Sequence, residues 1–213
     1  MPAASPVRVP PVALILIAAF AAAAGLWLGG RWLRAPAPPA LASAVLYPAP
    51  RELPEFHLTT SDGRPLDRAA WRGRWTLVYF GYASCPDVCP TTLATFKQVW
   101  QELARRHLDD RVRFDFVSVD PERDTPERLA SYVAFFDRDF VAATGSDAEL
   151  THLTRALGLI YARRSDANGA VTVDHSGSVV IIDPQARLVG LFRPPFAAAA
   201  IAADLATLVD RPG

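Results

Sequence analysis

The sequence predicts an α/β domain with a central mixed sheet flanked by helices, preceded by one membrane-spanning helix. Three observations support this prediction. Strand and helix signals alternate along the chain from about residue 55 to residue 208. The run WTLVYF (75–80) is continuously apolar, which is typical of a strand buried on both faces of a sheet. Residues 11–30 contain no charged side chain.

The apolar segment 11–30 is long enough to anchor the chain. Its twenty residues, at about 1.5 Å each, span a bilayer core of roughly 30 Å. A cleaved signal peptide is the alternative, but its small-x-small cleavage site should follow the apolar region closely. The candidate sites at 40–42 and 42–44 lie well past it, beyond Arg31 and Arg34. We therefore expect an uncleaved anchor.

Charged residues flank the apolar segment almost equally on both sides, and those in the rest of the chain are nearly balanced. Arg8 lies on one side of the apolar segment and Arg31 and Arg34 lie on the other, so the positive-inside rule does not orient it. Without these three arginines, 19 basic residues stand against 22 acidic ones, a net charge of −3. This charge gives no indication of nucleic-acid binding.

We expect three parts along the chain. Residues 1–33 hold the amino terminus and the anchor, and residues 34–50, rich in Pro and Ala, form a semi-extended tether. Residues 51–213 form the soluble domain, which is large enough for one sizeable core.

The first half of this domain shows the following elements. A hairpin turn at SDG (61–63) separates strand residues 55–60 from 64–66. After the strand at 75–80, apolar residues recur with a helical period from 90 to 107. The expected elements that follow are a second central strand at 111–120, a helix whose first turn holds Pro126, and a short strand at 140–145.

The second half of the domain continues the alternation. In order, we expect a helix at 147–157, adjacent strands at 170–173 and 178–183, a turn at 183–187, a strand at 188–192 and a closing helix at 195–208. Strand, helix, strand, helix, hairpin and helix together indicate a mixed sheet.

The chain has two cysteines, Cys85 and Cys89, in the stretch YFGYASCPDVCP (79–90), and each precedes a proline. Because proline biases the preceding residue away from helix, we expect a stiff loop at 85–89 with Pro90 as the first helical residue. The loop follows the carboxyl end of a central strand, where open α/β sheets place their sites. A helix amino terminus stabilises thiolates, so their pKa should fall, although Asp87 opposes this if it faces the sulfurs.

Three chemistries suit two close thiols: a disulfide, a metal site, or cycling between thiol and disulfide. The alternative is that both cysteines are buried and only structural, but a Gly- and Pro-rich loop is a poor place for side chains that pack in the core. The C-x₃-C spacing also differs from the C-x₂-C of ordinary thioredoxin-like enzymes.

A soft metal would need a third ligand, and the chain has four histidines. His107 should be solvated at a helix end, His152 should be structural within a helix, and nothing directs His57 toward the loop. His175 lies in VTVDHSGS (171–178), the turn between two apolar strands. A turn at the end of the sheet could bring its ring to the thiols, with Asp174 orienting the ring. From the residues alone, its role as a ligand stays open.

Three segments in this order and spacing resemble one family. YFGYASCPDVCPTTL (79–93), VSVDPERDTPE (117–127) and VDHS (173–176) are similar to the SCO/SenC (SCO1/2-type) copper chaperones of cytochrome c oxidase assembly. The likeness covers roughly residues 50–210, and the anchor fits the family plan. It implies a thioredoxin-like fold and one copper ion, Cu(I) or Cu(II), per chain. The ligands that it implies are Cys85, Cys89 and His175.

The resemblance also implies a location and partners. The chain would be a single-pass protein of the inner membrane, with its amino terminus in the cytoplasm and its domain in the periplasm. Copper would pass to the CuA site of oxidase subunit II, a copper donor protein would load the site, and a thioredoxin-like reductant would keep the redox-active pair Cys85 and Cys89 reduced. A fourth donor for Cu(II) would be Asp87 or water.

Alternatives stay open at this stage. The chain could be a thiol–disulfide oxidoreductase acting on subunit II or another envelope protein, or a copper or redox sensor, so enzymatic activity is undecided. The segment DPERDTPE (120–127) is either ordinary helix capping by Asp124 or Thr125 or a docking surface; capping is favoured. Asp120 could line the site.

Overall fold

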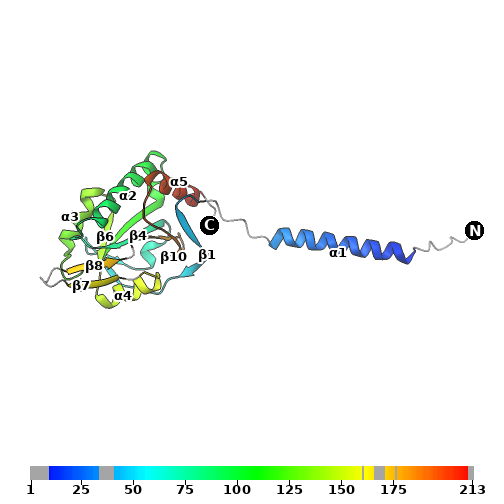
Figure 1. Ribbon diagram of the computed structural model, residues 1–213, viewed down its shortest axis with the longest axis horizontal. Coiled ribbons are helices and arrows are strands. Elements are labelled where there is room, and N and C mark those ends of the chain that lie inside the picture. Colours follow the sequence, from blue (N-terminus) through cyan, green and yellow to red (C-terminus); the bar gives the residue numbers. More distant parts are fainter. Residues whose placement is uncertain (1–9, 34–40, 160, 166–170, 176, 211–213) are drawn as a thin grey trace, which may run out of the picture. The chain divides into compact units, whose positions relative to one another are not determined.

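The computed structural model describes residues 10–33, 41–159, 161–165, 171–175 and 177–210. It divides into two units, Met1–Ala40 and Leu41–Gly213, which are described separately. In the first unit, α1 (Pro11–Leu33) is a single helix whose segment 12–30 is long and apolar enough to cross a bilayer (Figure 1). The predicted helix is therefore present.

The second unit is built on one eight-stranded sheet with the order β1-β10-β9-β4-β5-β6-β2-β3. The strands are β1 (Ala44–Glu52), β2 (Leu58–Thr60), β3 (Pro65–Leu66), β4 (Trp75–Gly81), β5 (Val112–Ser118), β6 (Val141–Thr144), β9 (Val179–Ile182) and β10 (Arg187–Phe192). The pairs β4–β5 and β5–β6 are parallel, and the other pairs are antiparallel. The predicted mixed sheet is confirmed.

Helices cover the sheet. They are α2 (Val88–Arg105), α3 (Pro126–Phe136), α4 (Asp147–Ala156) and α5 (Ala198–Val209). α2 packs beside α5, and α3 contacts β6. Figure 1 shows α2 and α5 on one side of the sheet and α4 on the other. Two layers of helices therefore exclude water from both faces of β4 and β5.

The core is centred on β4 and β5. Residues 76–81 of β4 and 114–118 of β5 are all buried, as the apolar run predicted. The ring of Phe96 on α2 lies 5.0 Å from that of Phe114, and the ring of Tyr132 on α3 lies 5.4 Å from that of Phe116. Each of the three phenylalanine rings is fully buried and contributes about 1.5–3 kcal/mol. These contacts hold α2 and α3 against β5.

A second sheet has two antiparallel strands, β7 (Tyr161–Ser165) and β8 (Val171–His175), with Tyr161 opposite His175. We expected a strand at 170–173 but none at 161–165. β8 pairs with β7 rather than with β9, and it also contacts β4. The hairpin therefore lies against the strand that leads into the cysteine loop.

The strand β1 occupies part of the segment that the composition assigned to the tether. It is an edge strand paired with β10, and its register shifts between Leu46 and Arg51, the stretch that contains Pro48 and Pro50. Proline cannot donate a hydrogen bond to a sheet but is tolerated at edges and bulges. The prolines therefore interrupt the strand without removing it from the sheet.

Candidate metal centre

The two cysteines lie where β4 gives way to α2. β4 ends at Gly81, residues 82–87 form a loop, and α2 begins at Val88. The carboxyl end of β4 therefore carries the site, as the pattern predicted. Cys89 is already within the first turn of α2, however, so the expectation that Pro90 is the first helical residue is wrong. Proline is tolerated in a first turn because those N–H groups have no helical partner.

The thiols of Cys85 and Cys89 are adjacent and unequal. Both are free cysteines, and the backbone N–H of Cys89 donates a hydrogen bond to Cys85 Sγ over 3.4 Å. Cys89 is fully buried, whereas Cys85 is half-buried. The loop therefore presents one sulfur toward solvent and keeps the other inside the domain.

The pKa of Cys89 is raised, whereas the helix amino terminus was expected to lower it. Burial, with a smaller contribution from the neighbouring Cys85, raises the pKa of the Cys89 thiol to about 12, against a lowering by the Tyr82 backbone. The helix end does not offset the loss of hydration. Without a metal, Cys89 is therefore a neutral thiol near pH 7. A metal cation would provide the charge that allows it to ionise.

Two tyrosines border the sulfurs. Burial raises the pKa of Tyr79 and of Tyr132, and the negative charges that Cys89 and Cys85 carry once ionised contribute to both shifts. Both phenols therefore stay protonated and lie within electrostatic reach of the thiols. The sequence offered a weak signal for Tyr79 only, through its place in the central strand; nothing in the pattern singled out Tyr132.

Gly81 is a site residue that sequence reasoning missed. A Cβ on Gly81 would lie 2.9 Å from Cys89 Sγ and 2.9 Å from Cε2 of Phe116. These distances are shorter than real Cβ contacts. The absent side chain therefore makes the room in which the Cys89 sulfur sits. The signal for it was a glycine that ends an otherwise bulky buried strand.

His175 is the last residue of β8, and the position of its side chain lies outside what the structure describes. Its strand contacts β4. Within the described residues, no group of three His, Cys, Asp or Glu is placed to hold a metal ion. The structure thus brings Cys85 and Cys89 together and leaves the third ligand as a prediction.

The other histidines lie apart from any such group in the described structure. His57, His107 and His152 are all exposed. His107 follows α2 with a φ of 55°, in the left-handed region that often ends helices. The expected solvation of His107 is confirmed, whereas His152, expected to be structural, lies on the exposed side of α4.

The acidic segment after β5 caps a helix and also contacts the cysteine loop. Thr125 is the N-cap of α3, accepting a hydrogen bond from Arg128 N at 3.3 Å. Asp120 is buried and paired with Arg123. Asp124 does not cap the helix. Its buried carboxylate accepts a hydrogen bond from Ala83 N, in the cysteine loop, over 2.9 Å.

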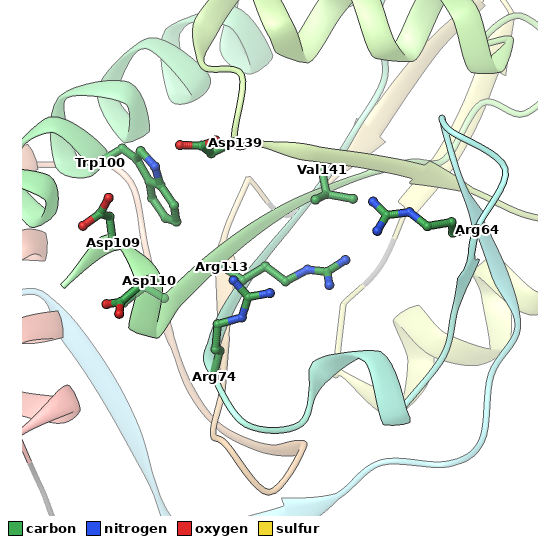
Figure 2. A pocket seen from close by; sticks show the side chains of 9 residues that line it. Arg64, Arg74, Trp100, Asp109, Asp110, Arg113, Asp139 and Val141 are labelled. Carbon is green, nitrogen blue, oxygen red and sulfur yellow. The ribbon is translucent and has the colours of Figure 1, made fainter. Parts of the chain in front are cut away.

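A charged cavity of about 310 Å³ lies at the other end of the central strands from the cysteines, where β4, β5 and β6 begin. Figure 2 shows the guanidinium groups of Arg64, Arg74 and Arg113 pointing into a common space. The other residues that line it are Trp100, Asp109, Asp110, Val112, Asp139 and Val141. Neither cysteine reaches this cavity, and it offers a copper ion no sulfur or imidazole ligand.

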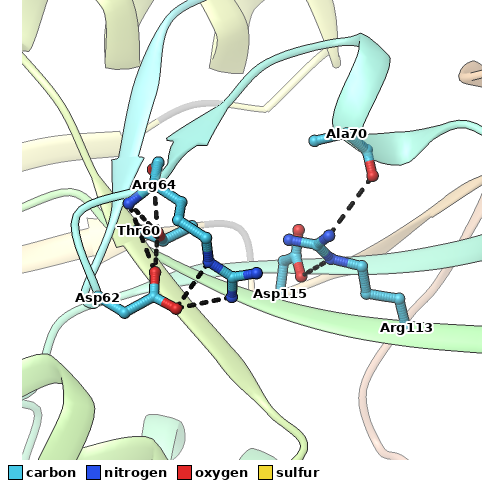
Figure 3. Close-up of polar contacts among 6 residues, drawn as sticks. All are labelled: Thr60, Asp62, Arg64, Ala70, Arg113 and Asp115. Atoms are coloured by element: carbon cyan, nitrogen blue, oxygen red, sulfur yellow. Dashed lines mark hydrogen bonds and ion pairs between the residues drawn. The ribbon is translucent and has the colours of Figure 1, made fainter.

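Two of these arginines are already paired within the domain (Figure 3). Arg64 binds the carboxylate of Asp62, with Nη2 at 2.6 Å. Arg113 Nε donates to Oδ1 of the fully buried Asp115 at 2.5 Å. Burial raises the pKa of Asp115, and Arg113 opposes that rise. The Arg113–Asp115 pair satisfies a buried carboxylate of the sheet, whereas the Arg64–Asp62 pair lies at the surface; we assign both pairs a structural role.

Comparison with known proteins relates this chain to one family. The family model described as SCO1/SenC matches residues 46–210. A relative from Stutzerimonas stutzeri, named "Putative copper-binding protein", is 31% identical over 154 residues, which cover 72% of this chain and 75% of the relative. The human protein named "Protein SCO1 homolog, mitochondrial" is 36% identical over 154 residues, which cover 71% of this chain and 51% of the human protein.

A solved structure shares the fold. The structure described as "Bradyrhizobium japonicum ScoI with copper bound" superposes with a TM-score of 0.66 at 32% identity, covering 72% of this chain and 97% of the other. This chain matches only about half the length of the human relative. A family match over most of the domain, together with the shared thioredoxin-like fold, settles the relationship. The chain belongs to the SCO1/SenC family.

Proposed function

We propose that this chain is a membrane-anchored copper metallochaperone that binds one copper ion through Cys85, Cys89 and His175. The observation that supports this most is the pairing of the two sulfurs, one buried and one half-exposed, at the end of β4. The contact between β8 and β4 is consistent with a third ligand from His175. The copper named for the Stutzerimonas and Bradyrhizobium proteins supports the choice of metal.

The ligand chemistry suits Cu(I). Two thiolates and one imidazole form a soft set of three donors, which favours Cu(I) over hard cations. Both thiols lose their protons when copper binds and regain them when it leaves. Cu(II) would need a fourth donor, for which Asp87 or water is available; Asp87 is exposed and makes no capping hydrogen bond.

Delivery would proceed by ligand exchange to the copper-binding thiols of the CuA site in cytochrome c oxidase subunit II. One structural neighbour is described as a member of the Sco family of cytochrome c oxidase assembly proteins. Loading requires a copper donor protein and the dithiol form of the pair. In an oxidising compartment the pair closes to a disulfide, so a thioredoxin-like reductant must supply two electrons and two protons.

The anchor gives this activity a location. Residues 1–33 would form the cytoplasmic terminus and the spanning helix of the inner membrane, with the copper-binding domain in the periplasm. The length and composition of α1 support a span. The segment after the anchor would serve as a tether, shorter than residues 34–50 because β1 already belongs to the sheet.

Copper titration tests the site directly. We expect the reduced full chain, kept in detergent, to bind one Cu(I), with two sulfur neighbours and one nitrogen neighbour by X-ray absorption. Cys85→Ala, Cys89→Ala and His175→Ala should each weaken Cu(I) binding at least tenfold. His152→Ala, which changes an exposed histidine elsewhere in the domain, is the control and should bind as the unaltered chain does.

Dithiol exchange is the second candidate function, favoured by two neighbouring cysteines that form no disulfide, with the backbone N–H of Cys89 hydrogen-bonded to Cys85 Sγ. In that reaction a substrate disulfide is reduced to two thiols while Cys85 and Cys89 form a disulfide. His175→Ala separates the two functions: a chaperone loses copper affinity and retains dithiol exchange. If His175→Ala left copper affinity unchanged, the proposed ligand set would be wrong.

A further inference from the structure

The loop that carries Cys85 is held from outside by the segment that follows β5. Within the loop, Cys85 N donates to Tyr82 O over 3.2 Å. Two further contacts come from the segment 124–128: Asp124 accepts from Ala83 N, and Arg128 Nη2 donates to Ser84 Oγ over 2.8 Å. The two residues that directly precede Cys85 are thus both held by this segment.

Asp124 is itself firmly placed. Its residue is 1% exposed, and Oδ2 accepts from Ser118 Oγ at 2.6 Å as well as from Ala83 N at 2.9 Å. The guanidinium of Arg128 lies 3.7 Å from Oδ1. A buried carboxylate with two donors and a neighbouring cation is a strong acceptor. Since Ser118 ends β5, Asp124 connects the cysteine loop to the most buried part of the sheet.

The two sulfurs are held by different means. Cys89 belongs to α2 and is enclosed by the core, where Gly81 makes room for its sulfur. Cys85 belongs to the half-exposed loop that precedes the helix. Two sulfurs that share one metal must stay roughly 4 Å apart, given metal–sulfur distances of about 2.3 Å. The position of Cys85 relative to Cys89 therefore depends on what fixes the loop.

We propose that Asp124 is a positioning residue of the copper site, whose buried carboxylate holds the Cys85 loop so that its sulfur meets Cys89. This inference rests on the proposed function. Arg128 supports it from the surface through Ser84. The segment DPERDTPE thus has a task beyond the capping of α3 by Thr125.

The chain contains a matched control. Asp183 is also buried, at 3%, accepts from the backbone N–H groups of Gln185 and Arg187, and pairs with Arg187 four residues later. It lies in the turn between β9 and β10, outside the cysteine loop. Replacing Asp124 or Asp183 removes the same kind of group, but only Asp124 contacts the Cys85 loop.

The first measurement needs no copper. In the reduced, metal-free full chain, the alkylation rate of Cys85 is followed by mass spectrometry for Asp124→Asn, Asp124→Ala and the same changes at Asp183. We expect Cys85 to react at least threefold faster in the Asp124 variants than in the Asp183 variants, because the loop is released. A smaller difference overturns the proposal. Ser84→Ala, which leaves the core intact, should increase the rate less than Asp124→Ala if the segment acts as described.

The second measurement uses Cu(I) and a chromophoric chelator as competitor. The Asp124 variants should bind Cu(I) at least tenfold more weakly than the Asp183 variants at a similar loss of thermal stability, with a changed copper–sulfur shell by X-ray absorption. Equal affinities and equal sulfur shells would contradict the positioning role. If the unaltered chain binds no copper through its cysteines, the proposed function fails, while the alkylation result still decides whether Asp124 holds the loop.

Discussion

At the scale of single residues, any side chain at position 81 would occupy the space that the Cys89 sulfur fills. Gly81→Ala places a methyl group 2.9 Å from Cys89 Sγ and from a ring carbon of Phe116. Overpacking of this kind costs about 1–3 kcal/mol. We expect a lower Tm and weaker Cu(I) binding, measured by thermal melting and chelator competition.

The control for Gly81→Ala is Gly73→Ala. Gly73 has a φ of 86°, and no atom lies within 4 Å of the place that an added methyl group would take, so its substitution strains the backbone without a contact. It should lower the Tm and leave copper affinity unchanged. Equal copper affinities in the two variants would show that the contact with Cys89 has no influence on the site.

The two cysteines should differ in reactivity. Cys85 is half-buried, whereas Cys89 is fully buried and has its pKa raised to about 12, which leaves a thiolate fraction of about 10⁻⁴ at pH 8. In Cys85→Ser and Cys89→Ser single variants, we expect the remaining Cys85 to be alkylated much faster than the remaining Cys89.

The alkylation rate of Cys89 should increase with pH. Below its raised pKa, the Cys89 thiolate fraction increases about tenfold per pH unit, so its alkylation rate should still rise steadily between pH 7 and pH 9. A Cys89 rate that levels off in this range would contradict the raised pKa. Urea unfolding of both variants is the control, since it should bring the two rates together.

At the scale of elements, α5 holds the first strand of the domain through one carboxylate. Asp204 is 4% exposed and accepts hydrogen bonds from the backbone N–H groups of Ala42, Ser43 and Ala44, at 2.8, 2.7 and 2.8 Å. Asp204→Ala leaves these donors unsatisfied, and we expect a loss of about 2–4 kcal/mol in the free energy of unfolding.

Denaturant unfolding measures that loss, and hydrogen exchange localises it to β1. Asp204→Asn is the matched variant, because its amide keeps one acceptor oxygen and should lose less stability. If β1 kept its protection in Asp204→Ala, the carboxylate would not be what secures this strand.

Most elements were predictable from periodicity, and the failures have physical reasons. The apolar run at 75–80 became β4 because burial on both faces permits no polar alternation. β1 was missed because Pro48 and Pro50 interrupt its pattern, and an edge position tolerates them. β7 was missed because ARRS (162–165) carries no apolar alternation, and its pairing with β8 is a tertiary effect.

The two cysteines of the site were predictable from the sequence, but the residues that surround and hold them were not. Cys85 and Cys89 stood out as the chain's entire complement of thiols, and their place after a central strand was confirmed. The contact between Asp124 and the cysteine loop was not predictable, because Asp124 lies 41 positions from Ala83 and the fold alone brings them together. For Gly81 the only signal was a glycine at the end of a bulky buried strand, which does not show that its missing side chain makes room for Cys89. The raised pKa of Cys89 followed from burial, which the helix-end argument did not weigh.

At the scale of the whole molecule, the two units should separate cleanly. Residues 41–213 form a compact unit of their own. We expect a chain that starts at residue 41 to leave the membrane fraction, remain soluble and melt within a few degrees of the full chain. A chain that starts at residue 51 loses most of β1 and every backbone partner of Asp204 named above, so it should melt well below both.

Carbonate extraction followed by thermal melting of the three chains checks this prediction. A soluble full-length chain would contradict the assignment of α1 as an anchor. Equal melting of the chains that start at 41 and 51 would show that β1 contributes little to the domain.

The unequal exposure of the two cysteines determines the order in which a partner protein can reach them. An incoming protein, whether it receives a metal or exchanges a disulfide, touches Cys85 first, since Cys89 is enclosed by the core. Under the proposed function, the outer sulfur would then be the point of entry and the inner one the point of retention. A handover would accordingly begin with the outer bond and finish with the inner one, so the last step, release from Cys89, would govern how long the cargo stays.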